Sequence, residues 1–149
     1  MQNSKTFLLF ILFWGIKSML SAQNKPDDIV GYYLVKDIFS PALSQIHIYN
    51  TGKGTYEAIV IWVSEKDQKQ NEGLLFLWGM TFNAVENEWQ NVSMLYPGKS
   101  WKFSAWMRFE KDGRLRVRGY WGVSLFGKTV YFTREEKSRN PKIQPILKN

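Results

Sequence analysis

The sequence predicts an all-β fold, a single antiparallel domain of about eight strands. Short runs in which apolar and polar residues alternate recur from residue 30 to residue 134, and helical periodicity is scarce. Turn-forming residues separate these runs at short intervals. Consecutive strands with short connections leave two economical architectures, a closed up-and-down barrel or a two-sheet sandwich. Closure is favoured for strands this long and aromatic, because it removes exposed strand edges.

The predicted strands lie between recognisable turns. In chain order they span residues 30–35, 44–50, 56–63, 74–83, 88–95, 100–110, 114–121 and 128–134. The joints between them are Ser40-Pro41, residues 51–54, the polar run 64–73, Glu86-Asn87, residues 96–98, Asp112-Gly113 and Phe126-Gly127. Residues 37–43 and the tail are the helical candidates. Residues 23–29, which are polar and contain Pro26, are expected to form a short leader.

The strongest strand signal is a hairpin that turns at residues 111–113. If these residues form the loop, with Gly113 in the left-handed position, one face becomes apolar and the other carries arginines and a tryptophan. The apolar pairs are then Phe103 with Trp121, Ala105 with Gly119, Met107 with Val117, and Phe109 with Leu115. The opposite pairs are Glu110 with Arg114, Arg108 with Arg116, and Trp106 with Arg118. A two-residue loop would mix the two faces, so the three-residue loop is predicted.

A second hairpin can be registered in the same way. Ile46 is expected opposite Val60 and Ile48 opposite Ala58. Simple alternation then places Trp62 on this same apolar side.

The first residues resemble a secretory signal. Lys5 precedes an apolar run at residues 7–16, and the small residues Ser21 and Ala22 follow, so cleavage is expected before Gln23. The run is too short to span a bilayer, which needs about 20 residues; a retained signal anchor is the alternative. We therefore expect a protein that is exported, to the periplasm or beyond, and does not span a membrane.

The predicted organisation is a signal peptide at 1–22, a barrel domain at 23–134 and a C-terminal tail at 135–149. The chain has no cysteine, which excludes disulfides, thiol nucleophiles and thiolate metal sites. Its formal net charge is +7, and loss of Lys5 and Lys17 with the signal leaves +5. This modest excess suits solubility or attraction to an anionic envelope component. No nucleic-acid recognition motif is present, and no nucleic-acid partner is expected.

The order of motifs resembles a known family. Gly31-Tyr32-Tyr33 at the first strand and Arg134 at the end of the last are similar to the aromatic and basic pair of calycin (lipocalin-like) barrels. The closer resemblance is to the exported bacterial family called domain of unknown function 2147, over about residues 29–134. Its motifs here are Ile48-Tyr49, residues 56–62, Gly73-Leu74, Trp89, residues 96–101, residues 115–120 and residues 126–129.

This resemblance implies a single antiparallel up-and-down lipocalin-like barrel of unassigned activity, outside the cytoplasm, in which Tyr33 and Arg134 close the barrel. Two loops depart from the family pattern. Residues 96–98 are shorter and lack the usual acid, and residues 65–69 replace an Asn-Pro element.

Catalytic chemistry has little support in the sequence. His47 is the only histidine, and no nucleophile-elbow spacing accompanies it. The carboxylates lie in the expected leader, loops and tail, and no phosphate-binding or calcium-binding loop occurs. We therefore expect a protein that is not an enzyme and that uses no metal and no cofactor.

Aromatic residues suggest binding. The inner face is expected to contain Trp62, Phe103, Met107, Val117 and Trp121, which would line a lumen for a small apolar or amphipathic ligand. Small residues on that face, Ala58, Ala105 and Gly119, would leave room. The alternative is that the aromatics fill the core of a small barrel.

The outer face offers a second interpretation. Trp106, Arg108, Arg116 and Arg118 would form a contact face for an anionic envelope component, with Arg118 stacked on Trp106. In that case the protein is an envelope-associated interaction protein with a filled core. The alternative is that the guanidinium groups simply extend into water.

Overall fold

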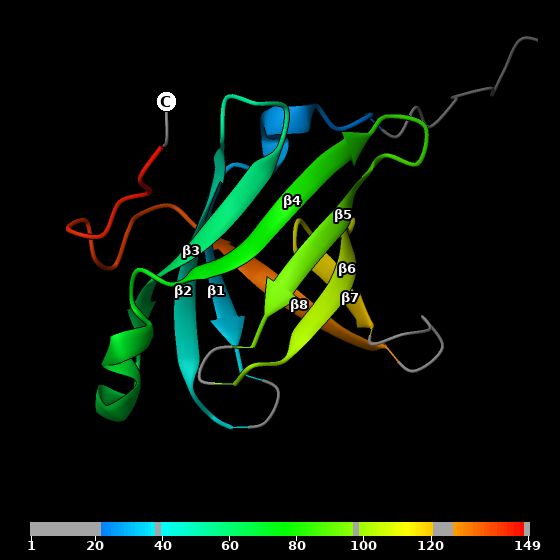
Figure 1. Ribbon diagram of the computed structural model, residues 1–149. Helices are drawn as coiled ribbons and strands as arrows, with labels where there is room; N and C mark the ends of the chain where they lie inside the picture. Colours follow the sequence, from blue (N-terminus) through cyan, green and yellow to red (C-terminus); the bar gives the residue numbers. More distant parts are fainter. Residues whose placement is uncertain (1–21, 38–39, 97–98, 121–126, 148–149) are drawn as a thin grey trace, which may run out of the picture.

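The computed structural model describes residues 22–37, 40–96, 99–120 and 127–147, which form one closed antiparallel barrel (Figure 1). Each strand pairs with the next in sequence, and the last pairs with the first. The strands are β1 Gly31–Lys36, β2 Leu43–Asn50, β3 Tyr56–Val63, β4 Leu75–Asn83, β5 Glu88–Leu95, β6 Lys102–Phe109, β7 Leu115–Tyr120 and β8 Lys128–Glu135. The predicted all-β barrel is therefore confirmed, and closure leaves no open sheet edge among these strands.

The β6–β7 hairpin has the predicted register. Ala105 pairs with Gly119, Met107 with Val117, and Arg108 with Arg116. Gly113 has φ +83°, the left-handed conformation that a glycine adopts without steric cost. The remaining predicted pair, Phe103 with Trp121, includes a residue outside the described part of the chain.

The β2–β3 hairpin follows the prediction only up to a bulge. Ile46 pairs with Val60 as expected, but the next pair is Gln45 with Trp62, so Ile61 has no partner of its own in this ladder. An extra residue on one strand reverses which face the following side chains occupy. Val63 consequently joins the core, and the prediction that Trp62 points inward is wrong.

The expected leader is instead part of the fold. Residues Pro26–Ile29 form a 3₁₀ helix, η1, which covers one end of the barrel (Figure 1). Ile29 is fully buried in the core, and the Trp89 indole donates a hydrogen bond of 3.0 Å to the Pro26 carbonyl. We call this end of the barrel the closed end. A second 3₁₀ helix, η2 (Lys66–Asn71), follows β3 at the opposite, open end.

The helical interpretation of residues 37–43 is wrong for the part that is described. Residues 40 and 41 form a bend and β2 already begins at Leu43, while residues 38 and 39 lie outside the described chain. Pro41 supplies the physical reason, because a proline disfavours the helical conformation of the residue before it.

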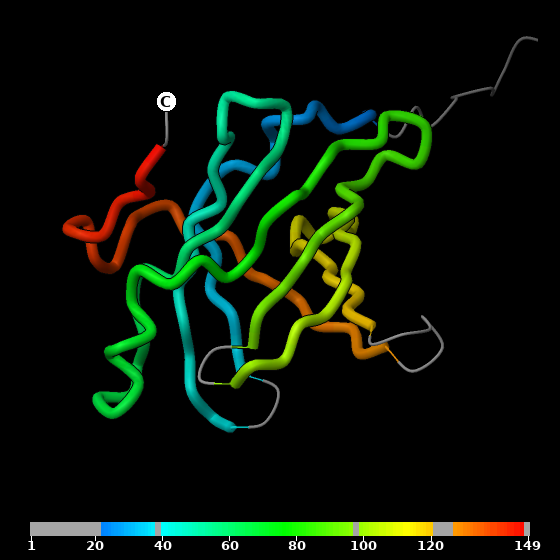
Figure 2. Tube along the Cα trace, viewed as in Figure 1, coloured from blue at the N-terminus to red at the C-terminus, as the bar shows by residue number. Residues whose placement is uncertain are grey.

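The segment after β8 packs against the outside of β2 and β3 (Figure 2). Ile143 contacts a small outer cluster of Tyr49, Ile59 and Ile61. Gln45 is completely buried beneath the tail, and its amide bonds Glu135, the Lys137 carbonyl and the Arg139 amide. A buried amide needs such partners, so the tail is a fixed part of the barrel wall up to this point.

Candidate functional site

The barrel interior is divided into a packed half and a hollow half. Trp89, Met107 and Val117 are fully buried toward the closed end, where Trp89 meets the Phe109 ring edge-on at 5.5 Å between centroids. At the open end the same inner face borders a cavity of about 240 Å³. This is larger than an engineered cavity of about 150 Å³ that binds benzene, so the space can hold a small organic molecule.

Apolar side chains form the walls of this cavity. The strand alternation that buries the core also directs the strand residues of this set inward at the open end, except for Leu95 at the last position of β5. The wall residues are Val35, Ile46, Val60, Phe76, Met94, Leu95, Phe103, Val130 and Phe132, together with Gly119 and Gly127. Because Gly119 has no side chain, it widens the cavity where a larger residue would fill it.

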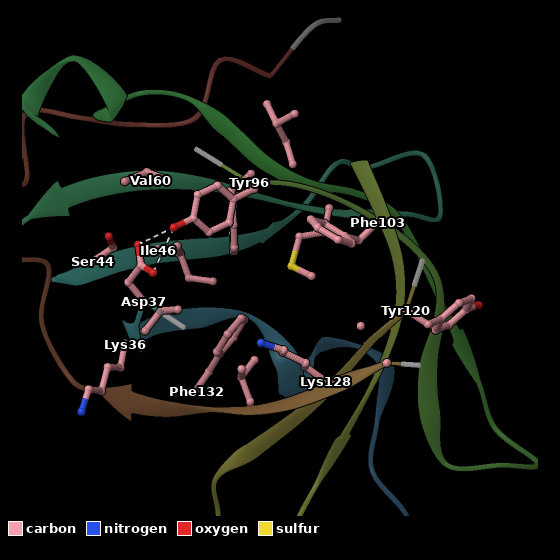
Figure 3. Close-up of a pocket in the computed structure, with 17 residues that line it drawn as sticks. Lys36, Asp37, Ser44, Ile46, Val60, Tyr96, Phe103, Tyr120, Lys128 and Phe132 are labelled. Atoms are coloured by element: carbon pink, nitrogen blue, oxygen red, sulfur yellow. Dashed lines mark hydrogen bonds between the residues drawn. The ribbon is translucent and has the colours of Figure 1, made fainter. Parts of the chain in front are cut away.

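Polar groups gather at the rim. Tyr96 donates its hydroxyl proton to Asp37, with distances of 3.0 and 2.9 Å to the two carboxylate oxygens. Burial and the Asp37 carboxylate together raise the Tyr96 pKa to about 12, so the hydroxyl remains a donor at neutral pH. Figure 3 shows this pair beside Ser44, with Lys128 extending from β8 and Lys36 directed away from the cavity.

The predicted lumen residues have different positions in the structure. Phe103 lines the cavity. Met107 and Val117 lie in the packed half, and Trp121 falls outside the described residues. Trp62 is on the outer surface, where Arg139 and Lys69 lie over its ring at 4.7 and 5.6 Å.

Sequence reasoning missed most of the cavity wall. The hairpin register predicts an inner-face position for Ile46 but no site role, and neither predicted hairpin includes Phe76 or Phe132. The available signal was the alternation within each strand; Phe76 on β4 and Phe132 on β8 both point inward, and their rings meet across the barrel at 6.4 Å between centroids. The rim pair of Asp37 and Tyr96 had no local signal, since 59 residues separate them.

Tyr33 and Arg134 are direct cross-strand partners where β1 meets β8. The Arg134 guanidinium lies 4.9 Å from the centre of the Tyr33 ring and bonds the tyrosine hydroxyl at 2.6 Å and the Val30 carbonyl at 2.9 Å. It also bonds the Asp28 carbonyl. This one side chain thus connects the last strand, the first strand and η1.

On the outer face of β6 and β7, two arginines stack on one tryptophan. The guanidinium carbons of Arg108 and Arg116 lie 5.2 and 5.5 Å from the Trp106 ring centre. Arg116 also pairs with Glu110 at 3.6 Å. The predicted partner, Arg118, is opposite Trp106 in the ladder and donates to the Thr129 hydroxyl at 3.2 Å. The ring is therefore contacted by Arg108, two residues along the same strand, and by Arg116, diagonal to it on β7, rather than by Arg118 directly opposite.

In the part of the chain that the structure describes, His47 has aromatic neighbours rather than a serine and an acid. Its ring lies 4.6 Å from the Tyr32 ring on the outer face, and burial lowers its pKa. The His47 Nδ1 atom is buried without a hydrogen-bond partner in the described part of the chain. Within the same residues, no group of three His, Asp or Glu side chains is placed to hold a metal ion.

Comparison with protein families matches residues 31–134 to a family described as "uncharacterized protein conserved in bacteria (DUF2147)". The match runs from the first residue of β1 to the penultimate residue of β8 and covers more than half of the chain. The chain belongs to the DUF2147 family. The resemblance noted in the sequence motifs is therefore confirmed.

A solved structure shows the same fold as this DUF2147 protein. It is HP1028 from the human pathogen Helicobacter pylori, described as a member of the lipocalin family, with 15% identity and a TM-score of 0.60. The likeness covers 73% of this chain and 84% of that one. At this identity it establishes a lipocalin-like fold alone. No curated protein is significantly similar to the DUF2147 chain in sequence.

Among the described residues, no helix has the length and apolar character needed to cross a membrane.

Proposed function

We propose that this DUF2147 protein is an exported, non-enzymatic binding protein that holds a small apolar or amphipathic ligand in the open half of its barrel. The observation that carries the proposal is the apolar cavity of about 240 Å³ that adjoins a fully packed core. An otherwise well-packed protein interior contains few voids larger than a water molecule. An apolar space with a few polar groups at its rim is the usual character of a small-molecule binding site.

A series of straight-chain alcohols tests this proposal. Burial of each methylene stabilises a complex by about 0.8 kcal/mol, which corresponds to roughly fourfold in affinity. From 1-hexanol to 1-octanol we expect affinity to rise by about this factor per carbon, and then to level off as the cavity fills. Titration followed by NMR should shift the methyl signals of Met94 and Val130. A flat series, or shifts spread over the outer surface, would contradict the proposal.

Export is tested by determining whether the signal peptide has been removed. Protein purified from its own host is expected to begin at Gln23, which intact mass determines directly. An intact N-terminal segment would indicate the retained anchor instead.

A second candidate function rests on the outer face of β6 and β7. Arg108 and Arg116 face each other directly, and the Arg116 Nε atom is buried without a hydrogen-bond partner among the described residues. Like charges opposite one another are unfavourable, and an anionic group bound between them would relieve this repulsion. On this basis the face would contact an anionic envelope component.

Charge reversal at both arginines tests the second candidate. Arg108→Glu combined with Arg116→Glu should abolish co-fractionation with envelope membranes, while leaving alcohol binding intact. Lys53→Glu combined with Lys111→Glu makes the same change in net charge at exposed turn residues and serves as the control. Equal fractionation of both variants would exclude a specific contact at this face.

A further inference from the structure

A second cavity, of about 330 Å³, adjoins the apolar one at the open end. Asp37, Ser44, Val60 and Tyr96 line both spaces, and Figure 3 shows these four residues together on one side of the apolar cavity. The other residues that line the second cavity are Val63, Asp67, Gln68, Gln70, Asn71 and Lys99. The two spaces therefore meet at the Asp37–Tyr96 hydrogen bonds.

The periodicity of η2 determines which of its side chains reach the second cavity. In a 3₁₀ helix, side chains three residues apart share one face. Lys69 and Glu72, the residue just after the helix, share the anchoring face: Lys69 bonds the Val63 carbonyl at 2.8 Å and Glu72 at 2.9 Å. Asn140 from the tail also bonds Glu72, at 3.3 Å. η2 is thus fastened to β3 and to the tail through one of its faces.

The other two faces of η2 border the cavity. Asp67 with Gln70, and Gln68 with Asn71, are the three-residue pairs on these faces, and all four line the space. Their side chains form no hydrogen bond or ion pair with any residue that the structure describes. Three of the four are side-chain amides, and each amide offers both donors and an acceptor. Such a set complements hydroxyl groups, which also both donate and accept.

The charges that line the second cavity itself disfavour an anionic headgroup. Among the described residues of its wall, Asp37 and Asp67 carry negative charge and Lys99 carries positive charge; Lys36 and Lys128 line the adjoining apolar cavity instead. The apolar cavity alone lies below the roughly 300–1,000 Å³ of ordinary ligand sites, and the two spaces together fall within that range. A molecule that occupies both would have a short apolar chain and a sizeable polar head.

We propose that the second cavity is a headgroup chamber for an uncharged, hydroxyl-rich group, so that the barrel binds a short-chain amphiphile with a sugar-like head. The inference rests on the proposed function, because the apolar chain must occupy the cavity of β1 to β8. Asp37, Gln68 and Asn71 are the residues expected to select the head.

The test compares molecules that share one apolar chain. Below its micelle concentration, n-octyl β-D-glucopyranoside should bind the full protein about tenfold more tightly than 1-octanol, as two net hydrogen bonds would provide. Octanoate should bind no more tightly than 1-octanol. Isothermal titration measures all three affinities. Equal binding of the glucoside and 1-octanol would overturn the headgroup chamber while the proposed function stands; absence of binding by all three would overturn both.

Two variants locate the effect. Gln68→Ala combined with Asn71→Ala should remove the tenfold gain for the glucoside and leave 1-octanol binding unchanged, because neither residue lines the apolar cavity. Gln90→Ala, at the closed end of β5, is the matched control and should retain the gain. A glucoside affinity that survives the double substitution, or tighter binding of octanoate than of the glucoside, would overturn the chamber.

Discussion

Trp89→Ala is expected to lower the free energy of unfolding by about 4–5 kcal/mol. Truncation of a buried aromatic residue to alanine costs about 3–5 kcal/mol through lost burial and the cavity that remains. The Trp89 ring is fully buried and contacts the rings of Phe82 and Phe109. The indole N–H also holds η1 through the Pro26 carbonyl, and loss of that hydrogen bond adds about 1 kcal/mol. Chemical denaturation followed by circular dichroism measures the change.

Two further variants keep this prediction testable. Trp101→Ala removes a tryptophan that is 41% exposed and should cost less than half as much. Trp89→Phe keeps most of the buried ring but not the N–H, so it should remain folded while η1 loosens from the barrel end. If Trp89→Ala and Trp101→Ala lower the free energy of unfolding equally, the buried Trp89 at the closed end does not stabilise the fold more than the exposed Trp101 does.

Gly119→Leu is expected to weaken 1-octanol binding at least tenfold without unfolding the protein. Gly119 lies in the cavity wall, opposite Ala105 on β6 and Lys128 on β8. A Cβ atom there would meet the Met94 methyl group at 3.1 Å, and this flexible end of a thioether can move aside. The leucine side chain then occupies space that the ligand needs. Titration calorimetry gives the affinity, and thermal unfolding verifies that the variant is folded.

Two further variants show whether weaker binding by Gly119→Leu comes from filling the cavity. Thr133→Leu adds a similar side chain at an exposed position of β8 and should leave affinity unchanged. Val130→Phe reduces the same cavity from another strand and should weaken binding as Gly119→Leu does. Undiminished octanol binding by both cavity variants would place the ligand elsewhere.

Much of the barrel follows from local pattern. Every predicted strand is present with ends within two residues of the observed ones, because period-two alternation and turn residues act over a few neighbours. The β6–β7 register could be predicted because a slip by one residue would have mixed the apolar and charged faces. The same reasoning failed at Trp62, since the bulge at Ile61 shifts the pairing of β2 with β3 and interrupts the alternation.

The sequence by itself determined the strands, the turns, the inner face of the β6–β7 hairpin and the family. The tertiary structure alone decided that the interior is filled at one end and hollow at the other. It also brought Asp37 to Tyr96, and η2 to the rim they share with Ser44. The physical reason is that a cavity is the difference between the volume a barrel encloses and the volume of the side chains directed into it. That difference depends on residues from all eight strands at once, and no single stretch of sequence specifies it.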